Sequence, residues 1–171
     1  MPTVALALGS NLPSRHGDPA ANVQMAAHLL GQLPHTQGLK ISSIYRVPAL
    51  LSAGDATPQP DYANAVVLVR TVLAPQTLLQ HTQALERDFG RVNHAGTRWQ
   101  PRTLDVDILL YDTITLDEVQ LHIPHPRLHE RHFMLQPLCE VWPDATIPQR
   151  GRAVDCLHAL AAVEALPVWK A

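Results

Sequence analysis

Two aspartates form the sharpest candidate for chemistry in this chain. In the run Arg-Thr-Leu-Asp-Val-Asp-Ile-Leu-Leu-Tyr at 102–111, Asp105 and Asp107 are two positions apart. Alternate side chains of a β-strand share a face, so a strand here would present both carboxylates together. The apolar residues that would then point into the core are Val106, Ile108 and Leu110. Neighbouring carboxylates repel each other unless a cation lies between them, and such hard oxygen ligands suit Mg²⁺. Two solvated surface aspartates are the alternative.

Arginines are concentrated just before this strand. Arg91, Arg98 and Arg102 lie on the loop that leads into it, with Trp99 among them. Cations beside a metal-binding carboxylate pair indicate a polyanionic ligand that bridges both, such as a nucleoside triphosphate with Mg²⁺. The alternative is that the arginines only keep the loop soluble. The P-loop and protein-kinase signatures are absent, so a phosphate site here must be built from side chains and metal.

Histidines form a second group, at positions 122, 125, 129 and 132. Their spacing raises the alternative of a zinc-dependent hydrolase, since His129 and His132 could share a helix face. However, prolines on both sides place His125 at a turn, and the sequence contains no His-Glu-x-x-His motif. A nucleotide contact by His125 is therefore favoured over zinc.

An amide and aromatic rings suggest a site for a flat heterocycle. Tyr62 and Asn64 are two residues apart at the start of a valine-rich strand, and Phe133 lies in a later helix. Rings could stack on the faces of a heterocycle while the amide reads its edge. Core packing of Tyr62 and Phe133 is the alternative.

Length and composition limit the class of protein. The 171 residues suit one domain, 1–171, and 46% apolar against 16% charged residues exclude a disordered chain. A net charge of −2 argues against a general binder of nucleic acid or of an anionic membrane. No apolar run approaches the ~20 residues that span a bilayer, and the N-terminus does not resemble a signal peptide. Cys139 and Cys156 indicate neither a disulfide framework nor a metal site. We expect a cytoplasmic monomer that acts on small molecules.

The order of predicted elements is β-α-β-β-α-β. The predicted strands are 3–8, 39–46, 62–72 and 104–111, and the predicted helices are 20–33, 75–90, 126–138 and 154–166. Long loops are expected at 47–61 and 91–103. This order predicts an α+β, ferredoxin-like antiparallel sheet with helices packed on it, plus a C-terminal helix.

That fold also admits a module that stacks single-stranded RNA on sheet aromatics. The acidic net charge, the lack of an RNP1-like run and the aspartate pair argue against it, because two carboxylates repel phosphate when no metal is present.

Several longer runs together resemble a known family. They are Ala-Leu-Gly-Ser-Asn-Leu at 7–12, Ser-Ser-Ile-Tyr-Arg-Val-Pro at 42–48, Gln-Pro-Asp-Tyr-Ala-Asn-Ala at 59–65, Arg-Trp-Gln-Pro-Arg-Thr-Leu-Asp-Val-Asp at 98–107 and Pro-His-Pro-Arg-Leu-His-Glu-Arg at 124–131. In this order, over Leu6 to about Pro148, they resemble 6-hydroxymethyl-7,8-dihydropterin pyrophosphokinase of folate biosynthesis.

The resemblance implies transfer of a pyrophosphoryl group from ATP to the hydroxymethyl oxygen of the pterin, with release of AMP. Two Mg²⁺ ions would be held by Asp105 and Asp107, and Arg91 and Arg102 would touch ATP and support the transition state. The remaining positions implied on the ATP side are Gln83, Glu86, Trp99, His125 and Arg131, with backbone groups of Ile108 and His122 at the adenine.

For the pterin, the resemblance implies two stacking rings, Tyr62 and Phe133, and an edge-reading amide, Asn64. Backbone groups near Val47 and Leu50 would complete this site. No essential general base is implied, which fits catalysis by positioning and electrostatics.

The chain departs from the family pattern in its loops. Asn93 stands where the family often has a basic residue, which leaves His94 as a substitute cation, and Gln100 replaces a usual glycine. The loop 47–61 is also longer than usual. These differences bear on loop closure and turnover and leave the expected reaction class unchanged.

Overall fold

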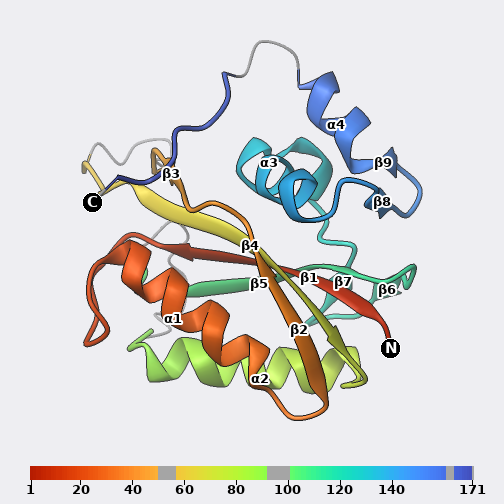
Figure 1. Cartoon of the computed structure of the whole chain (residues 1–171), viewed down its shortest axis with the longest axis horizontal. Coiled ribbons are helices and arrows are strands. Elements are labelled where there is room, and N and C mark those ends of the chain that lie inside the picture. The colour runs from red at the N-terminus through yellow and green to blue at the C-terminus, as the bar shows by residue number, and fades with distance from the viewer. Residues whose placement is uncertain (50–56, 92–100, 161–163, 171) are drawn as a thin grey trace.

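An antiparallel sheet lies between two layers of helices (Figure 1). The computed structural model describes residues 1–49, 57–91, 101–160 and 164–170, apart from the side chain of Leu39. Helices α1 (Pro19–Gly31) and α2 (Pro75–Asp88) cover one face of the sheet, and α3 (His132–Val141) and α4 (Ala153–Ala159) lie over the other. Each face has its own cluster of buried apolar side chains, so the sheet is covered on both sides.

The main sheet has the strand order β2-β4-β1-β5, with every neighbouring pair antiparallel. Its strands are β1 (Thr3–Ser10), β2 (Thr36–Ile41), β3 (Tyr45–Val47), β4 (Tyr62–Thr71) and β5 (Asp105–Tyr111). Strand β4 lies between β1 and β2, which is the split β-α-β arrangement of ferredoxin-like folds. The predicted α+β class with an antiparallel sheet is therefore confirmed.

The predicted strand 39–46 is in fact two strands, β2 and β3, which both pair with β4. The chain leaves the sheet after Ser42, whose amide still donates a hydrogen bond to the Val66 carbonyl at 2.9 Å. The Ser42 hydroxyl accepts a hydrogen bond from the Val66 amide at 3.0 Å and donates one to the Ser43 carbonyl at 2.8 Å. A side chain thus replaces a ladder partner, which lets β3 begin separately.

Local signals position α1 and α2 largely as predicted. Asp18 caps α1 by accepting a hydrogen bond from the Ala21 amide at 2.8 Å, and a proline follows it in the first turn. Ala74 provides no side-chain cap for α2, and Gly90, at φ +88°, lies just beyond its end.

The second helical layer differs from the prediction at both of its helices. Pro126 does not start an α-helix: a 3₁₀ turn, η1 (Leu128–Glu130), comes first, and α3 begins at His132 because Arg131 has extended backbone angles. The predicted C-terminal helix 154–166 is present as α4 but is shorter than predicted, since α4 ends at Ala159 and 164–170 contains no helix. Two short hairpins also form. Strand β6 (Leu116–Asp117) pairs with β7 (His122–Ile123), whose Ile123 packs in the cluster under α1 and α2, and β8 (Thr146–Ile147) pairs with β9 (Gly151–Arg152) beside α4.

A β-bulge in β5 changes which of its apolar residues share a face. Leu6 of β1 is opposite Ile108 and Ala5 is opposite Leu110, which leaves Leu109 as the extra residue. Ile108 packs in the cluster under α1 and α2, whereas Leu109 and Leu110 pack in the cluster under α3. Leu110 is buried as predicted, but on the opposite face from Ile108.

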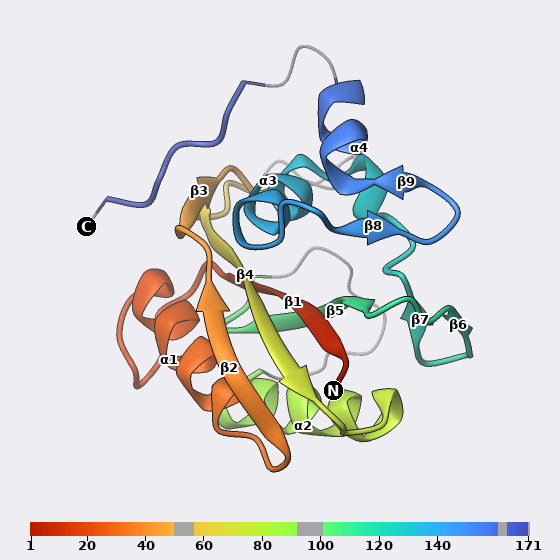
Figure 2. The same cartoon turned by 45° about the vertical axis from the view of Figure 1, so that its right-hand side comes forward.

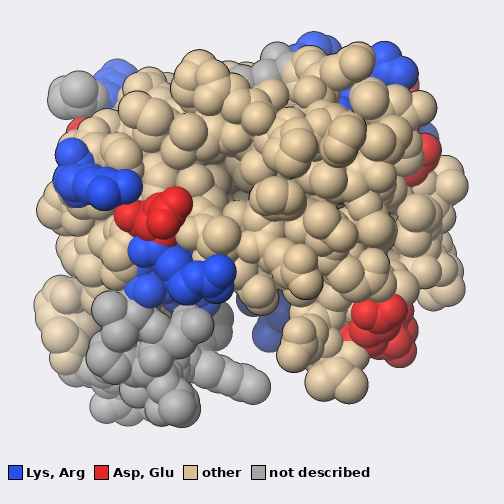
Figure 3. Space-filling model, turned by 90° about the horizontal axis from the view of Figure 1, so that it is seen from below, with Lys and Arg blue, Asp and Glu red and all other residues tan. Residues whose placement is uncertain are grey.

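The outer face of α1 and α2 carries few charges (Figure 3). Helix α1 contains no Lys, Arg, Asp or Glu, and α2 has such residues only from Glu86 to its end. Charged side chains accordingly lie toward the margins of this face. Across the described residues, none of the helices combines the length and the apolar character needed to cross a membrane.

Candidate functional site

A cavity of about 580 Å³ opens between the sheet and the η1–α3 region. It contains most of the side chains predicted for the site, although they are far apart in the sequence. The predicted residues that line it are Val47, Tyr62, Asn64, Arg102, Asp105, Asp107, His125, Arg131 and Phe133. This size is within the usual range of small-molecule sites.

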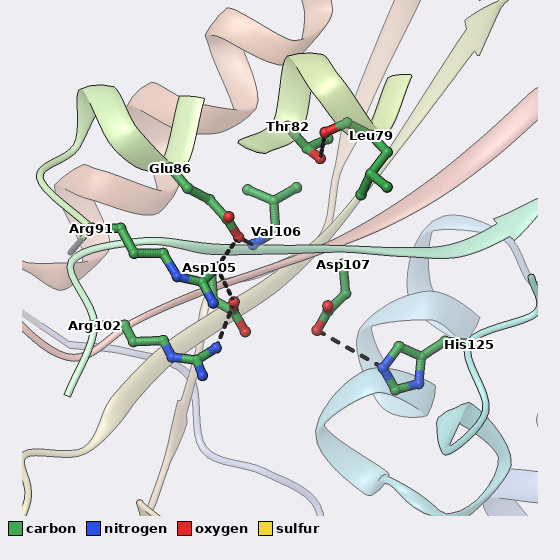
Figure 4. Close-up of polar contacts among 9 residues, drawn as sticks. All are labelled: Leu79, Thr82, Glu86, Arg91, Arg102, Asp105, Val106, Asp107 and His125. Atoms are coloured by element: carbon green, nitrogen blue, oxygen red, sulfur yellow. Dashed lines mark hydrogen bonds and ion pairs between the residues drawn. The ribbon is translucent and has the colours of Figure 1, made fainter. Parts of the chain in front are cut away.

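Asp105 and Asp107 share a face of β5, as the alternation predicts, and the two carboxylates differ in their partners (Figure 4). Oδ1 of Asp105 accepts hydrogen bonds from Arg91 Nη1 at 3.0 Å and Arg102 Nη1 at 2.8 Å. Asp105 is therefore compensated by two guanidinium groups.

Within the described residues, no Lys or Arg side chain forms an ion pair with Asp107. Its ion-pair partner there is His125, whose Nε2 is 4.0 Å from Asp107 Oδ2. Burial raises the pKa of Asp107 to about 7, and the negative charges of Asp105 and Glu86 add to this. Although Asp107 lies deep in the protein, 38% of its side-chain surface remains accessible, because the side chain lines the cavity. Its charge is thus left available to a cation that enters the cavity.

His125 is neutral in this environment. Its Nδ1 accepts a hydrogen bond from the Arg127 amide at 3.1 Å, so the ring proton is on Nε2, the nitrogen nearer Asp107. Burial and the positive charge of Arg131 lower the pKa of His125 to about 4. His125 can therefore donate a hydrogen bond from Nε2 into the site.

Glu86 connects helix α2 to the strand that carries the aspartates. Its Oε1 accepts a hydrogen bond from the Val106 amide at 2.8 Å, and Arg91 forms an ion pair with it (Figure 4). Strand β5 is an edge strand, so this carboxylate is the acceptor for a backbone amide on its unpaired side, where a neighbouring strand would otherwise provide a carbonyl. Burial raises the pKa of Glu86 to about 7, against the opposing effect of the Val106 hydrogen bond.

The rings and the amide lie at the other part of the cavity. Tyr62 and Asn64 share a face of β4, and Phe133 comes from the first turn of α3. Gly9 of β1 makes room for them: a Cβ there would be 2.9 Å from Asn64 Oδ1 and 3.7 Å from Tyr62 Cδ1. The Arg131 guanidinium carbon is 5.6 Å from the Phe133 ring centroid, within cation–π range.

Other predicted residues are outside the cavity lining. Arg91 and Glu86 lie behind Asp105, Ile108 is buried under α1 and α2, and Gln83 is exposed on α2. His122 is on β7, where its Nδ1 is 2.7 Å from Asp117 Oδ1. Leu50 and Trp99, together with Asn93, His94, Arg98 and Gln100, are outside the described residues.

The zinc alternative gains no support from the part of the chain that is described. Within 1–49, 57–91, 101–160 and 164–170, no three or more His, Cys, Asp or Glu side chains are arranged to hold a metal ion.

Sequence reasoning missed several lining residues, among them Gly9, Gln59, Arg127 and Met134. Gly9 could have been found, because it is within one of the motifs and a glycine inside a strand often marks a close approach. Arg127 is also within one of the motifs, but its residue type and spacing gave no sign of its place, because the turn before η1 brings it to the cavity.

The raised pKa of Glu86 predicts how the stability of the free protein depends on pH. A carboxyl whose pKa is higher in the folded state stabilises the fold fully when the pH is below about 4.5, its pKa in the unfolded chain. This contribution is lost as the pH rises through about 7, its pKa in the folded state. Glu86→Gln keeps an acceptor for the Val106 amide and cannot ionise. Between pH 4.5 and 8, the free energy of unfolding should therefore fall less in this variant than in wild type. The difference should be up to roughly 3 kcal/mol, at about 1.4 kcal/mol per pKa unit.

Urea denaturation across this pH range, without metal or nucleotide, measures the effect. Glu118→Gln is the matched control because the Glu118 side chain is exposed. Parallel pH profiles for wild type and Glu86→Gln would contradict the assignment.

The chain matches proteins of known family over most of its length. A family model described as 7,8-dihydro-6-hydroxymethylpterin-pyrophosphokinase (HPPK) matches residues 5–143. A protein of Pseudomonas aeruginosa named 2-amino-4-hydroxy-6-hydroxymethyldihydropteridine pyrophosphokinase is 37% identical over 166 residues, covering 96% of each chain. A protein of the same name from Synechocystis sp. is 36% identical over 162 residues, covering 95% of this chain and 76% of its own.

Solved structures share the fold. One described as HPPK-DHPS in complex with substrates has a TM-score of 0.68 at 11% identity, covering 92% of this chain and 44% of its own. Another, HPPK-DHPS of Plasmodium falciparum with pteroate, has a TM-score of 0.64 at 12% identity, with 92% and 42% covered. This chain thus spans less than half the length of those solved chains. The family model and the relatives nevertheless confirm the resemblance seen in the motifs, and the chain belongs to the 7,8-dihydro-6-hydroxymethylpterin-pyrophosphokinase family.

Proposed function

We propose that this chain transfers a pyrophosphoryl group from ATP to the hydroxymethyl oxygen of 6-hydroxymethyl-7,8-dihydropterin, giving AMP and the pterin diphosphate in folate biosynthesis. One observation carries the proposal: a single cavity holds an acidic pair flanked by arginines and, beside it, a pair of rings with an amide. A nucleotide tail and a flat heterocycle can therefore occupy the same site, and the family of the chain supports this reaction.

The ring part of the cavity would bind the pterin. Tyr62 and Phe133 come from opposite walls, the sheet and α3, so a planar ring between them can stack on both faces. Asn64 offers both a donor and an acceptor to the polar edge of the pterin. Val47 and the adjoining Pro48 line the same cavity, where their backbone groups would complete pterin recognition.

The charged part would bind the phosphates. Arg102 and Arg131 line the cavity and offer guanidinium donors to phosphate oxygens, while Arg91 reaches Asp105 from behind. His125 would donate from Nε2 to a phosphate oxygen. Trp99, Gln83 and backbone groups of Ile108 and His122 remain proposed contacts of ATP.

The carboxylate pair fits magnesium. Both donors are hard carboxylate oxygens on one strand face, and the charge of Asp107 is compensated only weakly by the residues around it. Asp105 and Asp107 would therefore hold two Mg²⁺ ions. When bound, the ions would neutralise phosphate charge and polarise the bond that breaks.

Positioning and electrostatics would supply most of the rate enhancement. The arginines and His125 would hold the phosphates, and the rings and the amide would fix the pterin so that its hydroxymethyl oxygen faces the β-phosphorus. His125 acts as a donor here, because Nδ1 is engaged and Nε2 carries the proton. The chain would act as a cytoplasmic monomer on these two small substrates.

The reaction is tested by following AMP. We expect AMP release from ATP only when the hydroxymethyl pterin and Mg²⁺ are both present, and we expect Asp107→Asn to lower kcat/KM by about 10²–10³-fold, the scale of one lost electrostatic contact in an active site. Asp144→Asn, at an exposed position, is the matched control. Pterin-independent AMP release, or near-normal turnover by a folded Asp107→Asn protein, would be incompatible with the proposal.

Stacking on Phe133 is tested separately from chemistry. Phe133→Leu keeps an apolar side chain but removes the ring, and we expect pterin affinity to fall by about tenfold or more, since ring stacking contributes ~1–3 kcal/mol. Affinity for Mg-ATP should be unchanged, and Phe133→Tyr should bind pterin as wild type does. Isothermal titration with each ligand measures both. Unaltered pterin affinity in Phe133→Leu would show that the ring is only a packing residue.

A substitution at Gly9 tests the pterin site without removing any side chain that would contact the pterin. Its backbone is extended, so alanine fits the strand, but the new Cβ would displace the Asn64 amide. We expect Gly9→Ala to fold normally and to bind pterin about tenfold more weakly, or ~1.4 kcal/mol. If Gly9 acts through Asn64, adding Gly9→Ala to Asn64→Ala should cause little further loss. Additive losses in this cycle would indicate a separate role for Gly9.

A further inference from the structure

The segment 166–170, called here the brace segment, lies along the side of β3 that faces away from β4. The Arg46 amide donates a hydrogen bond to the Pro167 carbonyl at 2.8 Å, and the Trp169 amide donates one to the Ile44 carbonyl at 2.7 Å. The three-residue strand β3 is thus bonded on both sides. Figure 2 shows how the chain returns from α4 toward β3 to make this contact.

Side chains strengthen the attachment. The guanidinium carbon of Arg46 is 4.0 Å from the Trp169 ring centroid, and Arg46 Nη2 donates to the Lys170 carbonyl at 3.3 Å. Arg46 Nη1 is also 3.6 Å from Asp61 Oδ2, next to the start of β4. Arg46 therefore joins the brace segment to the residue that precedes the ring-bearing strand.

The brace segment also reaches α3. The Leu166 amide donates to Gln136 Oε1 at 2.9 Å, and β3 itself contacts the same helix through a hydrogen bond from the Tyr45 hydroxyl to Glu140. Strand β3 and helix α3 are consequently connected both directly and through 166–170.

These two elements carry opposite walls of the cavity. Strand β3 ends at Val47, which lines the cavity and is opposite Tyr62 in the sheet, while α3 carries Phe133. Among the described residues, neither Arg46 nor Trp169 lines the cavity. We propose that the brace segment holds the two walls of the pterin slot in register, with Arg46 and Trp169 as positioning residues that set pterin affinity without touching a substrate.

This inference rests on the proposed function, and it predicts a selective effect. Deletion of 166–171 and Trp169→Ala should each weaken pterin binding by about tenfold, the scale of one lost hydrogen bond or cation–π contact. Affinity for Mg-ATP and kcat at saturating pterin should stay within about twofold, because the aspartates are on β5, away from the brace segment. Trp169→Phe keeps a ring under Arg46 and should restore most of the affinity.

Titration calorimetry and steady-state kinetics provide these values, and Val119→Ala, at a side chain 98% exposed, is the control. Hydrogen exchange at the Arg46 amide reports docking independently of any ligand. This amide should be protected in wild type and exchange faster in the deletion variant, because its acceptor is the Pro167 carbonyl. If the deletion variant does not fold, comparing pterin affinity between Trp169→Ala and Trp169→Phe tests the same inference.

Wild-type pterin affinity in Trp169→Ala would overturn the inference while leaving the proposed function intact. Equal losses of kcat, Mg-ATP affinity and pterin affinity would also overturn it, since they would indicate general destabilisation. If wild type with a protected Arg46 amide fails to bind the pterin, the proposed function is wrong, and the role of the brace segment in pterin affinity is wrong with it.

Discussion

Crowding of negative charge at the edge of the sheet is the constraint on which this structure depends. Asp105 and Asp107 extend from one face of β5, and Glu86 bonds the amide between them. Such a group is stable only if protons or cations compensate it, since like charges repel strongly where water is scarce. Arg91 and Arg102 compensate Asp105, and Arg91 also forms an ion pair with Glu86. Burial, together with the neighbouring negative charges, raises the pKa values of Glu86 and Asp107. The proposed binding of Mg²⁺ with the nucleotide would supply this compensation.

The fold separates this charged region from an apolar one within a single cavity. Strand β5 provides the carboxylates at one edge, β4 provides one ring and an amide, and α3 covers both with a second ring. The two parts adjoin at Arg131, whose guanidinium carbon is 5.6 Å from the Phe133 ring centroid. Because the two parts of the cavity are carried by different elements, contacts far from the reacting atoms, such as those of 166–170 with β3 and α3, influence the geometry of one part more than the other.

Much of the fold could be predicted because its signals are local. The valine-rich run of β4 and the apolar spacing of α1 indicated their structures directly, and strand alternation correctly placed Asp105 and Asp107 on one face. The errors have different causes. The bulge at Leu109 depends on pairing with β1, a strand distant in sequence, which periodicity does not report. The late start of α3 follows from the extended backbone of Arg131, and α4 ends at Ala159 although the apolar pattern continues. Likewise, Arg127 and Gly9 matter through neighbours that the chain meets only after folding.

The order of residues along the chain was sufficient for the α+β class, the antiparallel sheet, the family and the types of side chain that the site contains. These features depend on residue type and on side chains two to four positions apart in the sequence, so they do not require knowledge of how distant segments pack. Tertiary structure alone decided which carboxylate the arginines compensate, that Glu86 bonds the Val106 amide, that His125 is neutral, and that 164–170 returns to β3 instead of continuing a helix. These outcomes depend on distance and burial between segments up to 124 positions apart, such as Arg46 and Lys170, and only packing sets them.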